Sequence, residues 1–196
     1  MYRRSVLAAL SATSFIGVTK IKPSQAQDLS KLQPPLNMQD AVYMDIKYGR
    51  VLIQLRPDLA PKHVERVKIL CRQGFYDGTP FHRVIDGFMA QGGDPTGTGT
   101  GGSKLPNLPA EFTNKAHFLR GTVGAARTAD PNSANSQFFI MFAPAPSLDG
   151  LYTIWGRVVQ GMEYVDKIKR GTGPDGIVQD PDRIIRMRVA ADVEKG

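Results

Sequence analysis

The chain has 196 residues, of which 41% are hydrophobic and 22% charged, which is ordinary for a globular protein with a single domain. The net charge is +7, but four of the 25 basic residues lie in the first 26 residues, which contain no acid, so 21 remain against 18 acidic residues. Because no basic run with interleaved aromatic residues remains, we expect no nucleic-acid partner.

Residues 1–26 have the order of a signal peptide: basic Arg3 and Arg4, an apolar stretch over 5–18, and small residues up to Ala26. The apolar stretch is too short to span a bilayer, so we expect cleavage near Ala26, a periplasmic or otherwise exported protein, and no stable membrane anchor. The alternative interpretation is that residues 1–26 are only a disordered or helical tail. The general secretory route and the twin-arginine route both remain open. Cys71 is the only cysteine, which rules out an intramolecular disulfide.

Residues 27–40 contain Pro34 and Pro35 and are interpreted as a flexible linker before a domain of residues 41–192. Strict alternation over 42–48 and 51–56 predicts an antiparallel hairpin with one buried face. Pro61 and a later glycine predict a helix over 61–74, with Cys71 in the core and His63 on the surface.

Residues 81–94 are predicted to form two short strands with a kink at 86–87, placing the cation of Arg83 beside an apolar surface. The glycine-rich stretch 95–103 contains the pattern Gly-x-Gly-x-x-Gly, which binds a dinucleotide only when a helix follows. Pro106 and Pro109 prevent that helix, so an ordered surface loop is favoured over a nucleotide site.

The rest of the chain predicts further strands over 122–126, 137–142, 152–159 and 183–191, the last with Ile185, Met187 and Val189 on one face. A second helix is predicted over 161–169, with Met162, Val165 and Ile168 facing inward. Without alternation of strands and helices, this order favours a mainly β fold, a closed antiparallel barrel.

Three motifs carry a resemblance to a known family: FHRVIDGFMAQGGD at 81–94, AARTADPNSANSQFFI at 125–140 and LDGLYTIWGRV at 148–158. In this order they resemble the cyclophilin family of peptidyl-prolyl cis-trans isomerases, over residues 41–191. The resemblance implies an eight-stranded antiparallel barrel capped by two α-helices. It also implies an isomerase without metal or cofactor, acting on X-Pro bonds in unfolded or partly folded proteins and peptides. We expect a monomer.

The resemblance also assigns the site residues. It implies that Arg83 is the catalytic cation and that Gln91 positions it, while Gln137 contacts the substrate backbone and Ala126 and Arg127 form the edge that pairs with it. The proline pocket is implied to consist of Phe88, Met89, Phe139 and Leu148, with Tyr152 standing where many members have His. Of these ten residues, the catalytic set is Arg83, Phe88, Gln91 and Phe139.

The chemistry of this reaction explains why such residues are needed. Amide resonance sets a barrier of roughly 18–20 kcal/mol, and twisting the bond makes its nitrogen basic. A fixed guanidinium in a dry pocket therefore stabilises the twisted amide more than the planar one. The alternative is a proline-binding module or holdase with incidental catalysis. A triad of His82, Asp94 and Ser136 lacks a nucleophile elbow, and the three histidines lack metal-ligand spacing.

Overall fold

The alternating segments form eight strands, and a computed structural model of the chain describes them for residues 36–193 together with three α-helices. The strands are β1 (Ala41–Ile46), β2 (Gly49–Leu55), β3 (Arg83–Ile85), β4 (Met89–Gly92), β5 (Thr122–Ala125), β6 (Phe138–Met141), β7 (Ile154–Gln160) and β8 (Ile184–Val189). Short 3₁₀ turns η3 (Met38–Asp40) and η4 (Pro146–Leu148) accompany them. The prediction of a mainly β fold with eight antiparallel strands is confirmed.

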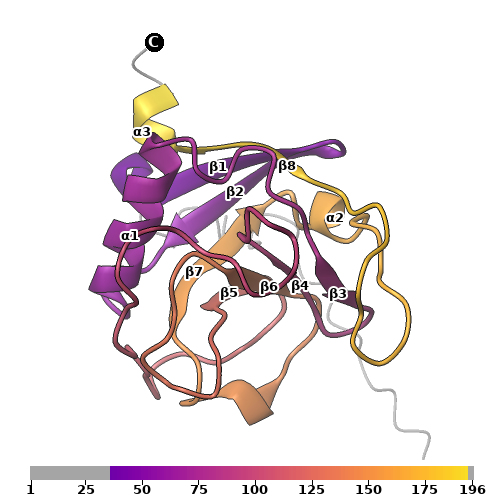
Figure 1. Cartoon of the computed structure of the whole chain (residues 1–196). Coiled ribbons are helices and arrows are strands. Elements are labelled where there is room, and N and C mark those ends of the chain that lie inside the picture. Colours follow the sequence, from indigo (N-terminus) through magenta and orange to yellow (C-terminus); the bar gives the residue numbers. More distant parts are fainter. Residues whose placement is uncertain (1–35, 194–196) are drawn as a thin grey trace, which may run out of the picture. The chain divides into compact units, whose positions relative to one another are not determined.

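All eight strands belong to one antiparallel sheet with the order β3-β4-β6-β5-β7-β2-β1-β8, which curls around a common interior (Figure 1). The expected closed barrel is wrong in one respect, because the edge strands β3 and β8 do not pair with each other. At this seam the described residues make an isolated bridge, Pro80 to Arg183, flanked by hydrogen bonds such as Phe81 N to Asp182 O at 2.8 Å. Pro80 has no N–H to donate, which limits a continuous ladder here.

The helices also differ from the expected two-helix cap. Helix α1 (Pro61–Arg72) matches its prediction and contacts β7 and β8. Helix α2 (Met162–Val165) is a single turn, and α3 (Ala190–Val193) is an unpredicted third helix. The predicted helix over 161–169 ends early: the Lys167 and Ile168 N–H groups donate three residues back, to Tyr164 O and Val165 O at 3.1 Å, in the manner of a 3₁₀ turn. The Lys169 N–H then donates to the buried Asp182 carboxylate at 2.9 Å, outside any helical pattern. None of the helices in residues 36–193 is long and apolar enough to cross a bilayer.

Strand faces follow the alternation closely except at one bulge. Val42, Met44 and Ile46 of β1 are all buried, as predicted. On β8, Met187 and Val189 are buried but Ile185 is 59% exposed, so its prediction is wrong. The β1–β8 register passes from Asp45↔Arg186 to Ile46↔Ile184, which leaves Ile185 unpaired at a bulge and turns its side chain outward.

The buried face of α1 includes two residues, Cys71 and His63, for which the sequence made a prediction. Cys71 is fully buried, as predicted, and burial raises the pKa of its thiol to about 12. His63 was predicted on the surface but is only 3% exposed. Its Nδ1 lies 2.7 Å from Glu111 Oε2, and Glu111 also accepts from the backbone N–H groups of Lys62 and His63 at 3.1 Å. Ala60 offers no side-chain cap to α1, so this distant carboxylate caps the helix instead.

The described chain begins with the end of the predicted linker. Within residues 27–40, the structure describes residues 36–40, where Met38–Asp40 form η3 and Asp40 lies 2.6 Å from Lys68 Nζ. Leu36 and Met38 pack on a small cluster around Leu52. The predicted signal peptide, residues 1–26, and residues 27–35 lie outside the described residues.

Apolar side chains pack on both sides of β6. Phe138 and Ile140 face the main core between the sheet and α1, together with Trp155. Phe139 and Met141 face a second cluster on the other side, with Met89, Phe118, Ala145 and Ile154. Burial of both faces explains why the strand is a continuous apolar run in the sequence. The second cluster is the foundation of the site described below.

The buried histidine predicts how stability depends on pH. Burial lowers the pKa of His63 below its ordinary 6.5, although Glu111 partly opposes this effect. The unfolded chain therefore binds more protons, and the free energy of unfolding should fall as pH drops below about 6.5. Each unit of pKa depression contributes about 1.4 kcal/mol. Burial lowers the pKa of His82 in the same direction.

We expect urea unfolding curves between pH 8 and pH 5 to show this decline, and His63→Gln to show a shallower one. His117, which is exposed, provides the matched control in His117→Gln. An unfolding free energy that stays constant over this range would contradict the assignment.

Candidate functional site

The β3–β4 hairpin places a cation and an amide on one side of the sheet edge. Gly87 takes a φ of +67°, which side chains disfavour, and the Phe88 N–H donates to Ile85 O at 3.1 Å to close the turn. The resulting register sets Arg83 directly opposite Gln91. Antiparallel partners have neighbouring side chains, so the hairpin itself fixes this pair.

A cavity of about 200 Å³ lies beside this pair. It brings together nine of the ten residues predicted for the site, from five separate segments of the chain. Its lining is Arg83, Phe88, Met89, Gln91, Ala126, Arg127, Phe139, Leu148 and Tyr152. We call it the proline pocket. The tenth residue, Gln137, lines an adjoining cavity of about 410 Å³ that shares Gln91, Ala126 and Arg127 with the proline pocket.

Aromatic rings form the apolar floor of the proline pocket. The Phe139 ring stacks on Phe118, with centroids 5.6 Å apart, and meets the edge of Tyr152 at 5.8 Å. Gly124 lies beneath the stacked pair, where a Cβ would come within 2.6 Å of Phe139 Cζ and 2.7 Å of Phe118 Cε1. Only a glycine leaves the two rings their present positions.

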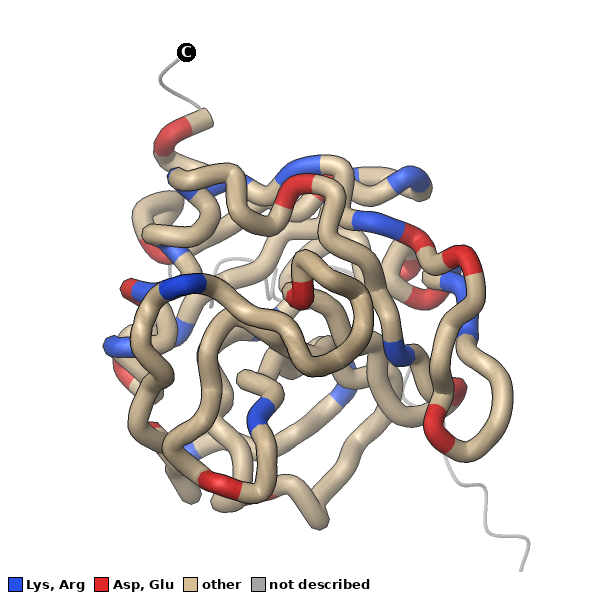
Figure 2. The backbone as a smooth tube through the Cα atoms, viewed as in Figure 1, with Lys and Arg blue, Asp and Glu red and all other residues tan. Residues whose placement is uncertain are grey.

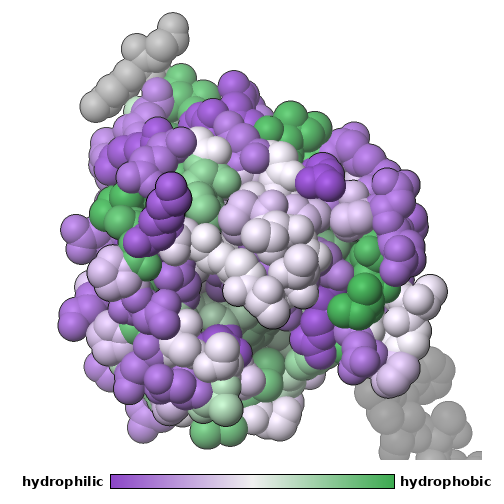
Figure 3. Space-filling model, viewed as in Figure 1, coloured by the Kyte–Doolittle hydropathy of each residue, from purple (hydrophilic) through white to green (hydrophobic). Residues whose placement is uncertain are grey.

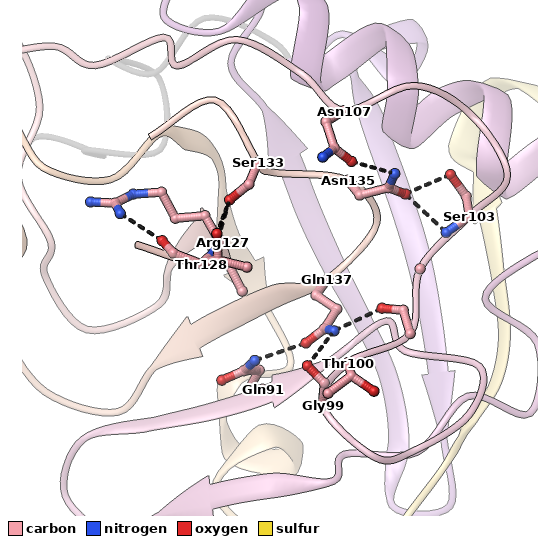
Figure 4. A pocket seen from close by; sticks show the side chains of 13 residues that line it. Gln91, Gly99, Thr100, Ser103, Asn107, Arg127, Thr128, Ser133, Asn135 and Gln137 are labelled. Atoms are coloured by element: carbon pink, nitrogen blue, oxygen red, sulfur yellow. Dashed lines mark hydrogen bonds between the residues drawn. The ribbon is translucent and has the colours of Figure 1, made fainter. Parts of the chain in front are cut away.

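A chain of hydrogen bonds holds the Arg83 guanidinium. Its Nη1 donates to Gln91 Oε1 at 3.2 Å, and its Nε donates to the carbonyl of Asp175 at 2.9 Å. Gln91 Nε2 then donates to Gln137 Oε1 at 2.9 Å, and Gln137 Nε2 donates to the carbonyls of Gly99 and Gly101 at 2.9 and 2.8 Å (Figure 4). Arg83 Nη2 has no partner within the described chain, so its N–H groups remain free for another acceptor.

The glycine-rich loop at the end of this chain is organised by a buried carboxylate. Asp94 is fully buried and accepts hydrogen bonds from the Thr96 amide and hydroxyl at 2.8 Å and from the amides of Gly99 and Gly101 at 2.7 and 3.1 Å. Burial alone would raise its pKa, but these donors hold the pKa of Asp94 below 3.8. An internal carboxylate thus takes the amide groups that a bound phosphate would need.

The adjoining cavity has polar, uncharged walls apart from Arg127. Asn135 connects them: its Oδ1 accepts from Ser103 N and Oγ at 2.9 and 2.7 Å, and its Nδ2 donates to Asn107 Oδ1 at 3.0 Å. Thr128 Oγ1 donates to Ser133 Oγ at 2.8 Å on the opposite side (Figure 4). The space-filling view shows a hollow on this face of the molecule, with both hydrophilic and hydrophobic residues around it (Figure 3).

Two other kinds of site considered from the sequence were a catalytic triad and a metal centre. Ser136 Oγ donates to the Gly93 carbonyl at 2.8 Å, and neither ring nitrogen of the buried His82 has a hydrogen-bond partner among the described residues, so these groups do not form a triad. Within residues 36–193, no three His, Cys, Asp or Glu side chains converge as metal ligands would.

Sequence reasoning missed three contributors: Phe118, Gly124 and the carboxylate of Asp94. A glycine inside a predicted strand signals the close approach of another group, so Gly124 could have been noticed. The stacking of Phe118 on Phe139 is a tertiary contact, which no local pattern reveals. The donors to Asp94 lie only two to seven residues further along the chain, so the Asp-x-Thr spacing of an Asx turn could have indicated them.

Comparison with known proteins identifies the family. The sequence model of the family described as "Cyclophilin type peptidyl-prolyl cis-trans isomerase/CLD" matches residues 41–189. The chain belongs to the cyclophilin family. A probable peptidyl-prolyl cis-trans isomerase of Brucella suis is 47% identical over 201 residues, covering 96% of this chain and 98% of the relative. A peptidyl-prolyl cis-trans isomerase of Schizosaccharomyces pombe is 43% identical, covering 65% and 83% of the two chains.

Solved cyclophilin structures have the same fold. A cyclophilin of Hirschia baltica superposes with a TM-score of 0.71 at 27% identity, covering 80% of this chain and 76% of its own. A cyclophilin-type isomerase of Cryptosporidium parvum, crystallised in the presence of the dipeptide Ala-Pro, gives 0.70 at 30% identity, covering 76% and 98%. This cyclophilin is accordingly an isomerase, and its activity is peptidyl-prolyl cis-trans isomerisation.

The contact beneath Phe139 yields a testable prediction. Gly124→Ala would place a Cβ 2.6 Å from Phe139 Cζ, so the ring must move toward the cavity. Overpacking of this kind costs roughly 1–3 kcal/mol of stability. We expect kcat/KM for a proline peptide to fall at least tenfold at a temperature where the variant is fully folded.

Ring signals of Phe139 in NMR spectra should shift in this variant, while those of Trp155 in the main core should stay in place. Unchanged catalysis with an unmoved Phe139 ring would show that the glycine does not shape the pocket.

Proposed function

We propose that this cyclophilin accelerates isomerisation of X-Pro bonds by Arg83-assisted twisting of the amide, without a covalent intermediate. One observation carries the proposal: the Arg83 guanidinium lines the same 200 Å³ cavity as Phe88, Met89 and Phe139. A ring-sized apolar cavity and a fixed donor together meet the needs of the reaction. The ring must be held while the other side of the bond rotates.

Arg83 suits the role of donor for electrostatic reasons. A twisted amide has a pyramidal, basic nitrogen, so a donor aimed at it stabilises the transition state more than the planar ground state. The guanidinium is always charged and planar, and its free Nη2 can reach a bound substrate while Gln91 and the Asp175 carbonyl hold the rest. Arg83 is half-buried, and a proline ring bound against Phe139 would remove further water from the guanidinium and so strengthen the contact.

The other residues of the pocket would bind the substrate. Phe88, Met89, Phe139, Leu148 and Tyr152 would hold the proline ring, while Ala126, Arg127 and Gln137 would contact the peptide backbone. Crystallisation of the Cryptosporidium relative with Ala-Pro supports proline-containing peptides as substrates. One chain supplies all ten residues, so the proposed activity needs no second copy, and we propose a monomer. A holdase or binding module would need the rings but not the hydrogen-bonded arginine, so isomerisation is favoured over that alternative.

We further propose that the protein acts outside the cytoplasm on unfolded or partly folded clients. The support is the basic, apolar and small-residue order of residues 1–26, followed by the linker that separates this signal from the isomerase domain of residues 41–192. These leader residues lie outside the part of the chain that the structure describes.

Substitution of Arg83 tests the mechanism. Arg83→Ala removes the donor and should raise the barrier by roughly 3–4 kcal/mol, a loss in kcat of about 10²–10³-fold. Affinity for a proline peptide should change much less, because the aromatic rings remain. Arg83→Lys keeps the charge without the planar fork and should recover part of the rate.

Phe139→Ala is the matched contrast, because it should weaken binding along with the rate. If Arg83→Ala bound proline peptides far more weakly yet turned over normally at saturation, Arg83 would be a ground-state anchor and the proposed mechanism would be wrong.

Export can be tested on the native protein. Its first residue should be at or near Gln27, and fractionation should place it outside the cytoplasm. N-terminal sequencing that still reads from Met1 would contradict this proposal. Blocking the general secretory route while leaving the twin-arginine route intact would distinguish the two export routes.

A further inference from the structure

The two adjoining cavities of the site carry charge of one sign. Their combined lining contains two charged side chains, Arg83 and Arg127, and no aspartate or glutamate. Both arginines line the proline pocket, and Arg127 also lines the larger cavity. A substrate residue beside the proline therefore meets positive charge without a compensating acid.

Neutral oxygen atoms hold both arginines. Arg83 donates to the carbonyl of Asp175 and to the Gln91 amide oxygen. Arg127 Nη2 donates to the Leu151 carbonyl at 2.8 Å, Nε to the same oxygen at 3.3 Å, and Nη1 to the Thr128 and Ala129 carbonyls at 2.8 and 3.4 Å. In the described part of the chain, neither guanidinium has a carboxylate oxygen within 4.0 Å.

Several other cations of the described chain are paired with acids instead. Nine lysine and arginine residues form ion pairs with aspartates: Lys47, Arg50, Arg56, Lys68, Arg72, Arg120, Arg170, Arg186 and Arg188. Figure 2 shows basic and acidic positions close together in several places on the backbone. Carbonyl partners fix a guanidinium without cancelling its charge, so the field of the two site arginines remains available to a substrate.

Arg127 is also fixed in place by aromatic rings. Its guanidinium carbon lies 4.4 Å from the ring centroid of Tyr152, a wall of the proline pocket, and 5.8 Å from that of Phe112. Asp130, three residues further along the chain, accepts from the backbone N–H of Asn132 at 2.9 Å. Asp149, two residues before the Leu151 carbonyl that binds Arg127, lies 2.7 Å from His117 Nδ1. The cation is thus held still beside the bound proline and faces no competing acid in contact.

We propose that Arg127 selects substrates in which a carboxylate side chain adjoins the proline. Acidic residues beside the proline would be attracted by Arg127 and Arg83 together, and basic residues would be repelled. The inference rests on the proposed binding of proline in this pocket. It adds a preference that the isomerisation chemistry itself does not require, because the twisted amide is the same for any neighbouring residue.

The size of the expected preference for an acidic neighbour depends on how exposed the charges of Arg83 and Arg127 are, and both are partly exposed. An ion pair near a surface changes an equilibrium by up to about fivefold, and two cations acting together extend this to about tenfold at low ionic strength. Repulsion of a basic residue acts with the opposite sign. The preference should shrink as salt increases, because the charges are close to solvent.

Two peptide series with the full chain test the proposal at pH 7.5. One series is Ala-X-Pro-Phe and the other is Ala-Ala-Pro-X, each with X as Glu, Gln or Lys. We expect at least one series to rank kcat/KM as Glu above Gln above Lys, with about tenfold between Glu and Lys at low salt. Arg127→Gln should reduce this ratio to about threefold or less, and Arg127→Lys should retain most of it.

Arg157→Gln is the matched control, because Arg157 is exposed on β7 and lines neither cavity, yet its substitution removes the same charge. It should leave the ratio unchanged. If all peptides turned over normally but kcat/KM did not rank Glu above Gln above Lys in either series, the proposal would be overturned and the isomerase function would stand. The same conclusion would follow if the ranking appeared but Arg127→Gln did not change it. Absence of turnover for every peptide would instead contradict the proposed function. Turnover of the Gln peptides reports whether Arg127→Gln preserves the pocket.

Discussion

A guanidinium can stabilise a twisted amide only if its position is fixed before the substrate arrives, and the contacts around Arg83 meet this requirement of the proposed mechanism. Arg83 is held by Gln91, Gln91 by Gln137, and Gln137 by the carbonyls of the glycine-rich loop, whose amides bind Asp94. The chain of hydrogen bonds thus ends at a buried, ionised carboxylate. Because each intermediate group is neutral, the chain fixes orientation while leaving the charge of Arg83 intact.

The apolar half of the site depends on the sheet having no solvent-facing side near β6. Phe138 and Ile140 fill the main core, whereas Phe139 and Met141 support the proline pocket from the other side. Alternate residues of β6 therefore pack in the main core and line or support the proline pocket. Gly124 on the neighbouring strand completes this arrangement, since the Phe118–Phe139 stack occupies the space where its side chain would be.

Local patterns predicted what local geometry determines. Alternation predicted the faces of β1, because the side-chain period follows from the backbone. The place of Gln91 beside Arg83 was implied by the family resemblance, and the β3–β4 register sets the two residues opposite each other. The prediction that Ile185 faces inward was wrong because a β-bulge breaks the period-2 alternation. The prediction that His63 lies on the surface was wrong because its partner, Glu111, lies 48 residues away in the chain. The open seam between β3 and β8 likewise depends on contacts between distant segments, which the sequence pattern does not contain.

The distribution of charge links these observations. Pairing a surface cation with an aspartate stabilises a protein only slightly, so leaving Arg83 and Arg127 without acids sacrifices little stability. Their hydrogen-bonding groups are still largely satisfied by carbonyl and amide oxygens, which avoids the larger penalty of unsatisfied buried donors. The site therefore keeps two positive charges and loses only the small stabilisation that two ion pairs would give. Other cations of the described chain, such as Lys104 and Arg157, also lack an acid partner, but they are exposed and line neither cavity. Arg83 and Arg127 differ from them because they line cavities whose walls contain no acid, so their charge faces the place where we expect the substrate to bind.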